Sequence, residues 1–282
     1  MIHRFLFHDI NEGLIRHAKR YVLVVIVVVI TCSMIDSMSA YFMDYFGEYW
    51  SPIEYGINEF YGRYPFVFDI NSTDKFTIPF GWVLIYLFLA YMIGDYIYKD
   101  MNGYGMYMMI KSKKRWYWWI SKCLWCVAVN VFYFGLLWIS NIAYSWMKHG
   151  DIAFYQESDL RMSYYGFGFD NMGMPKLLLV VIVMPLLVGI VQSILQITLT
   201  LIFNSVATMT IIAGILMLSC YYGSIYIPHS YAMLIRYFSN ESDPDFVAVD
   251  AGTGIAVLGI GIVAMVVMGY MIFRKKNVIS NR

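Results

Sequence analysis

The amino-acid sequence predicts an all-α integral membrane protein with six transmembrane helices and with both termini on the cytosolic side. Three observations predict this fold class: an apolar composition, six apolar segments of spanning length, and an uneven distribution of charge. Hydrophobic residues make up 60% of the 282 positions and charged residues only 14%, whereas soluble domains average roughly 45–50% apolar and about 25% charged residues. A soluble fold could not bury so large an apolar share.

Six segments are long enough to cross a bilayer, whose core of about 30 Å requires about 20 apolar residues in a helix. The predicted spans cover residues 21–40, 78–98, 116–144, 177–203, 206–227 and 252–273, with outer loops 41–77, 145–176 and 228–251. The fourth and fifth spans share one apolar stretch that is too long for a single crossing, so we place a tight turn at Asn204-Ser205. The chain is thus one transmembrane domain.

The charge distribution predicts the orientation of this domain. With the N-terminus inside, most of the 20 basic residues fall in cytosolic segments and most of the 19 acidic residues fall in outer loops, as the positive-inside rule requires. A cleaved signal peptide is the alternative for the first span, because Ser37, Ser39 and Ala40 follow the apolar run. The long basic leader before this run favours an uncleaved helix.

No motif in the sequence predicts an enzyme. Phosphate-binding loops, zinc-protease motifs and nucleophile elbows are missing, and the five histidines are scattered over both predicted sides of the membrane. The four cysteines lie in apolar stretches, where we expect buried small hydrophobic residues. We therefore predict no catalytic, metal or cofactor site in this chain, and no nucleic-acid partner. The predicted spans also lack ionisable groups near their middle, which argues against an ion-coupled carrier.

Two cytosolic segments are predicted to meet other surfaces. Residues 1–19 carry apolar residues at helical spacing with basic residues between them, which predicts an amphipathic helix on membrane lipid; the alternative is a disordered basic leader. Tyr104–Ile110 is apolar on all sides and precedes a basic run at Lys111–Arg115. Such a helix needs a partner to cover its exposed face, unless it is an interfacial loop whose basic residues bind headgroups.

Polar residues within the spans and aromatic residues in the first outer loop have two interpretations each. Gln192 and Gln196 share one helix face and, with Asn130, either hydrogen-bond a neighbouring helix or line a translocation route. Packing is the favoured interpretation. The aromatic residues of the first outer loop are expected to anchor short helices at the outer membrane surface, and contact with cargo is the alternative.

This layout resembles the permease subunits of type-2 ATP-binding-cassette exporters. The resemblance covers the topology of the whole chain and rests on four features: the surface helix, the segment from Gly103 to Lys122 with its basic and aromatic residues, the Asn204 turn, and the loop before the last span. The first outer loop is longer than in many members of that family.

The resemblance implies a multi-pass protein of the bacterial plasma membrane that pairs with a second copy or a homologous permease. It implies a separate ATPase subunit that binds ATP and Mg²⁺, and a cytosolic coupling helix seated in that subunit. The implied ATPase contacts are Tyr104, Met106, Tyr107, Met109, Ile110, Lys111, Lys113, Arg115, Asn204 and Ser205. An amphiphilic cargo (a peptide, an antibiotic or a lipid) suits the lack of charge in the spans. The alternatives are a non-transporting immunity or scaffold protein and an ion-coupled carrier.

Overall fold

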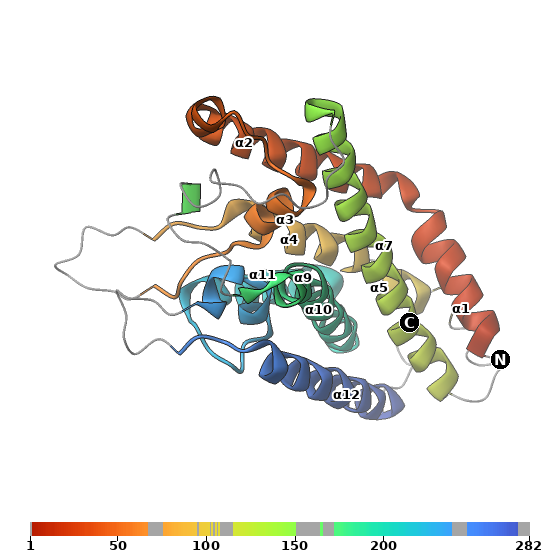
Figure 1. Ribbon diagram of the computed structural model, residues 1–282. Coiled ribbons are helices and arrows are strands. Elements are labelled where there is room, and N and C mark those ends of the chain that lie inside the picture. The colour runs from red at the N-terminus through yellow and green to blue at the C-terminus, as the bar shows by residue number, and fades with distance from the viewer. Residues whose placement is uncertain are drawn as a thin grey trace.

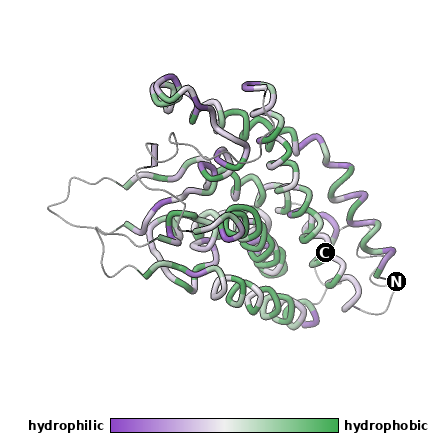
Figure 2. The backbone as a smooth tube through the Cα atoms, viewed as in Figure 1, coloured by the Kyte–Doolittle hydropathy of each residue, from purple (hydrophilic) through white to green (hydrophobic). Residues whose placement is uncertain are grey.

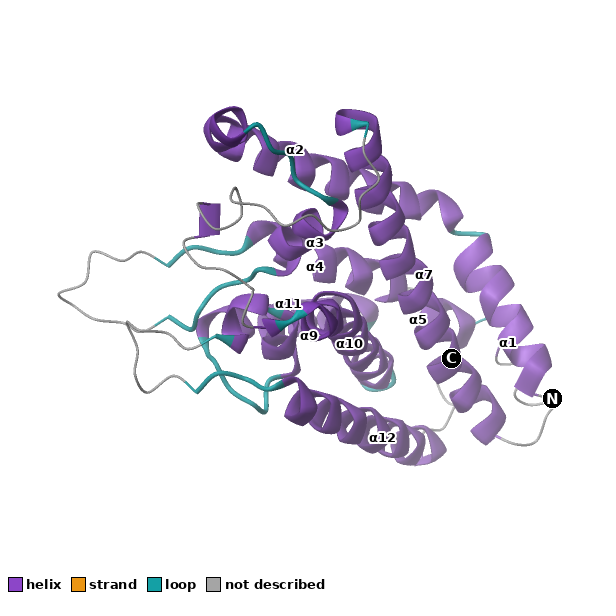
Figure 3. Cartoon of the chain, viewed as in Figure 1, coloured by secondary structure: helices purple, strands orange, loops and turns teal. Residues whose placement is uncertain are grey.

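A computed structural model of the chain describes residues 2–66, 76–94, 96–101, 115–150, 172–238 and 247–275, together with residues 103, 105, 107, 164 and 165. The secondary structure of these residues is helical, and no β-strand occurs among them (Figure 3). Among the residues that the structure describes, five helices are long and apolar enough to cross a membrane. The described part of the chain therefore has the architecture of an all-α, multi-pass membrane protein.

The candidate spans are built from helices with the following bounds. They are α2 (Val22–Phe46), α4 (Phe80–Gly94) leading into α5 (Tyr96–Met101), α7 (Arg115–His149), α9 (Met174–Leu178) leading through a π-turn into α10 (Met184–Thr200), and α12 (Ala251–Lys275). A further apolar helix, α11 (Ser205–Tyr221), has 17 residues and is about 26 Å long at roughly 1.5 Å per residue. Two short helices are α1 (Ile2–Ile10) and α3 (Pro52–Phe60).

The spanning helices run in alternating directions, as contacts between their ends show. Arg115 at the start of α7 donates to the carbonyl of Arg274 at the end of α12, while His149 at the end of α7 stacks on Tyr49, just after α2. The start of α7 and the end of α12 therefore lie at one end of the bundle, at the right of Figure 1, where the N-terminus is also labelled. We call this the inner end and the opposite one the outer end, after the predicted orientation.

Helices α2 and α7 extend several residues beyond their predicted ends, and each is terminated by a glycine. The first span was expected to end near residue 40 and the third near residue 144, but α2 continues to Phe46 and α7 to His149. Gly47 and Gly150 follow with φ of 67° and 73°, the left-handed conformation that commonly terminates helices and that glycine adopts without strain.

The helix that follows the Asn204 turn is shorter than predicted. It was expected to run to Ile227, but α11 ends at Tyr221 and Tyr222 is extended. The buried guanidinium of Arg236 donates to the carbonyls of Ser219 and Tyr222, so it satisfies carbonyls that a longer helix would have used. Residues 228–238 form two short 3₁₀ helices, Pro228–Ala232 and Leu234–Tyr237, which are almost completely buried.

The first outer loop is not simply an interfacial layer, because α3 is inserted into the bundle. Pro at its first turn and a capping box between Ser51 and Glu54 start the helix, and it packs against α2, α4 and α7. Trp50, Tyr55 and Phe60 are buried there, contrary to the expected anchoring at the membrane surface. The aromatic side chains of Tyr41, Tyr45 and Tyr49 are exposed instead.

Insertion of α3 also brings an ionisable group among the spanning helices, where none was expected. The Glu59 carboxyl accepts hydrogen bonds from Thr31 Oγ1 of α2 at 3.2 Å and from Asn141 Nδ2 of α7 at 2.9 Å. Glu59 is only 2% exposed to solvent. Glu59, which was counted with the first outer loop, contacts two of the spans, so the lack of ionisable groups within the spans no longer argues against an ion-coupled carrier.

Close packing of α3 against α7 can be tested at a glycine. A Cβ at Gly56 would lie 2.2 Å from the Trp138 ring, so Gly56→Ala must displace a large side chain, and we expect a loss of about 1–3 kcal/mol in stability. The measurement is unfolding in detergent micelles. Gly135→Ala on α7 is the matched control, because nothing lies within 4 Å of its added Cβ. Equal effects of the two changes would contradict the insertion of α3.

The pH dependence of stability reports on Glu59. Burial raises the pKa of its carboxyl from 4.5 to about 7, so between these values the folded protein keeps a proton that the unfolded chain has released. Stability should then fall as the pH rises through this window, by at most about 3 kcal/mol at roughly 1.4 kcal/mol per pH unit. Glu59→Gln should remove this slope from unfolding midpoints measured between pH 4.5 and 7.5. The exposed Asp44→Asn should keep it, and an unchanged slope in Glu59→Gln would refute the assignment.

Candidate functional site

The inner end of the bundle holds a buried cluster of charges from three helices. Asp9 lies on α1, Asp100 on α5 and Lys122 on α7, and their side chains are at most 3% exposed. The Lys122 ammonium forms an ion pair with Asp9 and a second one with Asp100 at 2.6 Å. We call Asp9, Asp100 and Lys122 the inner ion cluster. It joins α1 to α7 across 113 residues of sequence and joins α5 to both helices.

Neutral side chains satisfy the remaining atoms of the inner ion cluster. Tyr96 donates its hydroxyl hydrogen to Asp9 at 2.7 Å, Ser121 also donates to Asp9, and the Trp118 indole donates to Asp100 at 3.1 Å. The ammonium of Lys122 lies 4.7 Å from the Tyr96 ring centre and 5.1 Å from that of Trp118, within the range of cation–π attraction.

The geometry of the cluster suits a fixed connection between helices. Removing charges from water is expensive, and a buried ion pair is retained only when its geometry and hydrogen bonds are good. Here one ammonium bridges two carboxylates that come from different helices. A relative movement of α1, α5 and α7 would break at least one of these pairs, so the three helices are held together at this point.

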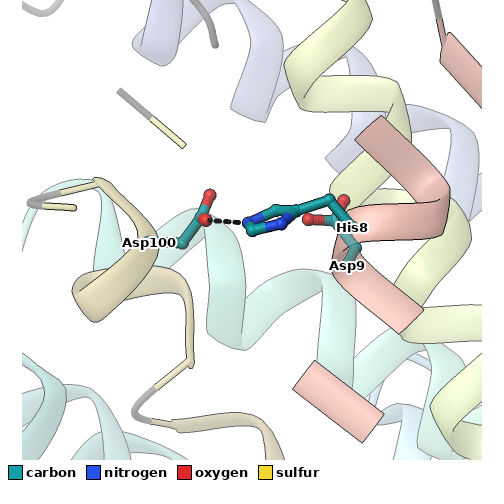
Figure 4. A group of neighbouring side chains, drawn as sticks. All are labelled: His8, Asp9 and Asp100. Atoms are coloured by element: carbon teal, nitrogen blue, oxygen red, sulfur yellow. Dashed lines mark hydrogen bonds and ion pairs between the residues drawn. The ribbon is translucent and has the colours of Figure 1, made fainter. Parts of the chain in front are cut away.

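His8 borders the cluster on the same helix as Asp9. Its Nε2 lies 3.3 Å from Asp100 Oδ1 (Figure 4). Ligand atoms of His8, Asp9 and Asp100 lie within 4.8 Å of one another, a spacing that a metal ion could bridge. Lys122 already provides a cation to both carboxylates, however, so the donor set is that of an ion pair rather than a metal centre.

The segment after α5 begins directly at the inner ion cluster. The Gly103 amide donates to the Asp100 carbonyl at 3.2 Å, and a Cβ at Gly105 would lie 2.0 Å from an Asp100 carboxylate oxygen. Only glycine allows the backbone to approach the carboxylate this closely. The start of the predicted coupling segment is therefore positioned by Asp100.

Of the implied ATPase contacts on this segment, Tyr107 and Arg115 are described. Tyr107 is 70% exposed, whereas Arg115 donates to carbonyls at the end of α12. The others lie outside the described residues: Tyr104, Met106, Met109, Ile110, Lys111 and Lys113.

The two implied contacts at the α10–α11 turn have structural partners. Asn204 is exposed, and its side chain caps α11 by accepting from the Ala207 amide at 2.8 Å, as N-cap asparagines do. The Ser205 hydroxyl donates to the Gly94 carbonyl at the end of α4. This turn and the α4–α5 boundary are thus adjacent.

The three residues predicted either to pack helices or to line a route are buried and join helices in this conformation. Gln192 and Gln196 donate from α10 to the carbonyls of Tyr86 and Ala90 on α4, and Asn130 donates from α7 to Ser193 on α10. The Nε2 of Gln192 is the donor to Tyr86, so its Oε1 is the acceptor of a second hydrogen bond, donated by the Nε2–H of His229 at 2.8 Å.

Sequence reasoning missed the inner ion cluster, although two signals were present. Asp9 interrupts the apolar face of the N-terminal helix, and Lys122 follows several aromatic residues inside the third apolar segment. The N-terminal segment was instead expected to lie on membrane lipid, and Lys122 was counted only among the cytosolic basic residues. The four cysteines, by contrast, are free and buried as predicted.

Comparisons with protein-family models, with curated proteins and with solved structures found no match to this chain. The resemblance to exporter permeases therefore stays an expectation that rests on topology.

Lys122 should be far more important for stability than an exposed basic residue. Lys122→Met leaves two buried carboxylates without a cation, and we expect a loss of about 3–5 kcal/mol. Arg16→Met, which breaks an exposed pair with Glu12, should lose at most about 0.5 kcal/mol. Unfolding in detergent micelles measures both, and Asp9→Asn should partly rescue Lys122→Met because neighbouring changes are not additive. Similar losses in the two single variants would rule out the cluster.

Proposed function

We propose that this chain is the membrane-spanning permease subunit of an ATP-driven exporter, whose ATP and Mg²⁺ are bound by a separate ATP-binding-cassette ATPase. The observation that carries the proposal is the inner ion cluster. It connects the surface helix α1 and the start of the predicted coupling segment to α7. A subunit that does not hydrolyse ATP itself needs such a connection between its cytosolic surface and its spanning helices.

The length of α7 supports a role in transmitting movement. Its 35 residues correspond to about 52 Å at roughly 1.5 Å per residue, and the Lys122 side chain is near its inner end. Force applied to the segment after α5 would reach α7 through Asp100 and Lys122. In the proposed cycle, ATP-driven closure of the ATPases favours one conformation of the permease through a difference in affinity for its conformations.

The apolar surface of the bundle supports the predicted partners. In the most apolar stretch of α12 only 11% of the residues are buried, and this helix carries hydrophobic residues along most of its length (Figure 2). Exposed apolar faces of this size need lipid or another protein. We assign them to membrane lipid and to a second copy or a homologous permease, with a transport cavity between the two.

An ion-coupled carrier is the second candidate, and Glu59 is the observation that favours it. A buried carboxyl between spanning helices is a common feature of proton- and ion-coupled transport. Such a carrier would move its cargo in liposomes with an ion gradient and without ATP, which distinguishes it from the exporter. A non-transporting immunity or scaffold protein would do neither.

The exposed Tyr107 provides a test for the ATPase partner. The full-length chain, purified gently from its host membranes, should carry an ATP-binding-cassette ATPase, identified by mass spectrometry. Tyr107→Asp places a charge in the proposed contact and should reduce the recovered ATPase at least tenfold, which corresponds to about 1.4 kcal/mol.

Tyr226→Asp is the control, because Tyr226 is 82% exposed and follows α11, far from the inner end. It should retain the ATPase. Absence of an ATPase from the unmodified chain, or its full retention by Tyr107→Asp, would contradict the proposed attachment.

A further inference from the structure

A cavity of about 510 Å³ lies between α2, the end of α3 and the start of α4. Its volume falls within the roughly 300–1,000 Å³ of small-molecule sites. The walls are mostly apolar: Ile26, Ile30 and Met34 form one row along α2, and Phe80, Leu84 and Phe88 lie opposite on α4. An apolar chain would therefore find hydrophobic contacts on two sides. Figure 1 shows these three helices as neighbours.

One carboxylate stands in this apolar wall. Glu59 lines the cavity from the end of α3, and its oxygens accept hydrogen bonds only from the neutral groups of Thr31 and Asn141. No basic side chain of the described part of the chain forms an ion pair with it. A buried carboxylate without a cation is unfavourable, and a bound cation would stabilise its ionised form.

The inner ion cluster differs from Glu59 in this respect. There the carboxylates of Asp9 and Asp100 have the Lys122 ammonium between them, so no charge is left for a ligand. At Glu59 the protein supplies neutral donors and an adjoining cavity, but no cation. Of the carboxylates of Asp9, Asp100 and Glu59, only that of Glu59 adjoins a space that an ammonium group could occupy.

The cavity opens toward the outside of the bundle. Ile26, Ile30 and Met34, which line it, are each about half exposed at 47%, 49% and 50%. These residues lie in the middle of α2, a candidate membrane span, so the opening faces the lipid phase. A molecule that dissolves in the membrane can reach Glu59 by this side.

We propose that this cavity is a binding site for a single-chain amphiphile with a protonated amine, whose ammonium group pairs with Glu59 while its alkyl chain lies between α2 and α4. Charge complementarity selects the amine, and the apolar rows on both helices select the chain. Identifying this molecule class as cargo rests on the proposed function; binding itself requires neither ATP nor an ATPase, so the two ideas can fail separately.

Binding can be measured with the full-length chain in nanodiscs of phosphatidylcholine, which lacks a primary amine. Radiolabelled dodecylamine is the probe, dodecanol is the uncharged molecule of the same chain length, and empty nanodiscs correct for partition into lipid. We expect saturable binding of dodecylamine to the protein, at least tenfold weaker binding of dodecanol, and at least a tenfold loss of dodecylamine affinity in Glu59→Gln. Equal affinities for the two probes, or no change in Glu59→Gln, would overturn the proposal.

A second pair of variants keeps the test valid if Glu59→Gln folds poorly. Ile30→Trp adds a large side chain inside the cavity and should abolish dodecylamine binding with Glu59 intact. Val29→Trp adds the same side chain at the neighbouring position, which is also exposed but does not line this cavity, and should bind normally. Equal effects of the two changes on dodecylamine binding would also contradict the proposal.

Two other occupants are separate outcomes of the same measurement. If phosphatidylethanolamine added to the nanodiscs abolishes dodecylamine binding, the site belongs to a two-chain amino lipid and the single-chain assignment is wrong. If Met34→Cys forms a disulfide between two copies of the chain, the opening is covered by a second copy, and the assignment is likewise wrong. Unchanged binding in the first case and no cross-link in the second support the proposal.

Discussion

The burial of one ammonium between two carboxylates at the inner end organises the structure of this protein. Lys122 could not remain charged inside the bundle without Asp9 and Asp100, and neither carboxylate could remain there without Lys122. This mutual dependence fixes α1 against α7 and fixes the end of α5 against both. It turns an N-terminal segment that could have lain loosely on the membrane into part of the folded domain.

Polar groups join the rest of the bundle in the same manner, with weaker interactions. Gln192 and Gln196 hold α10 to the backbone of α4, and Arg236 fastens the loop before α12 to the end of α11. Burial lowers the pKa of the Arg236 guanidinium to about 10, so it is still charged at neutral pH, and its hydrogen bonds to carbonyls compensate for lost water. Both side-chain amide atoms of Gln192 are paired, whereas the Oε1 of Gln196 is buried without a hydrogen-bond partner among the described residues.

Glu59 departs from this pattern, and the difference gives it functional interest. It has hydrogen-bond donors but no counter-charge, and it borders a cavity that opens to the surface of the bundle. The two carboxylates of the inner ion cluster are neutralised by Lys122. A carboxylate left without a cation beside an open apolar cavity is instead arranged to receive one.

The sequence by itself predicted the all-α, multi-pass fold class and the approximate positions of the candidate spans, because apolar length is a local property that a bilayer requires of any spanning helix. It also located the turn before Ser205, where an N-capping asparagine interrupts the apolar stretch. The insertion of α3, the burial of Glu59 and the contact of Lys122 with two carboxylates became apparent only in the packed structure. These outcomes depend on contacts between residues 22 to 113 positions apart, and neither hydrophobic periodicity nor the distribution of charge along the chain encodes which distant partners come together.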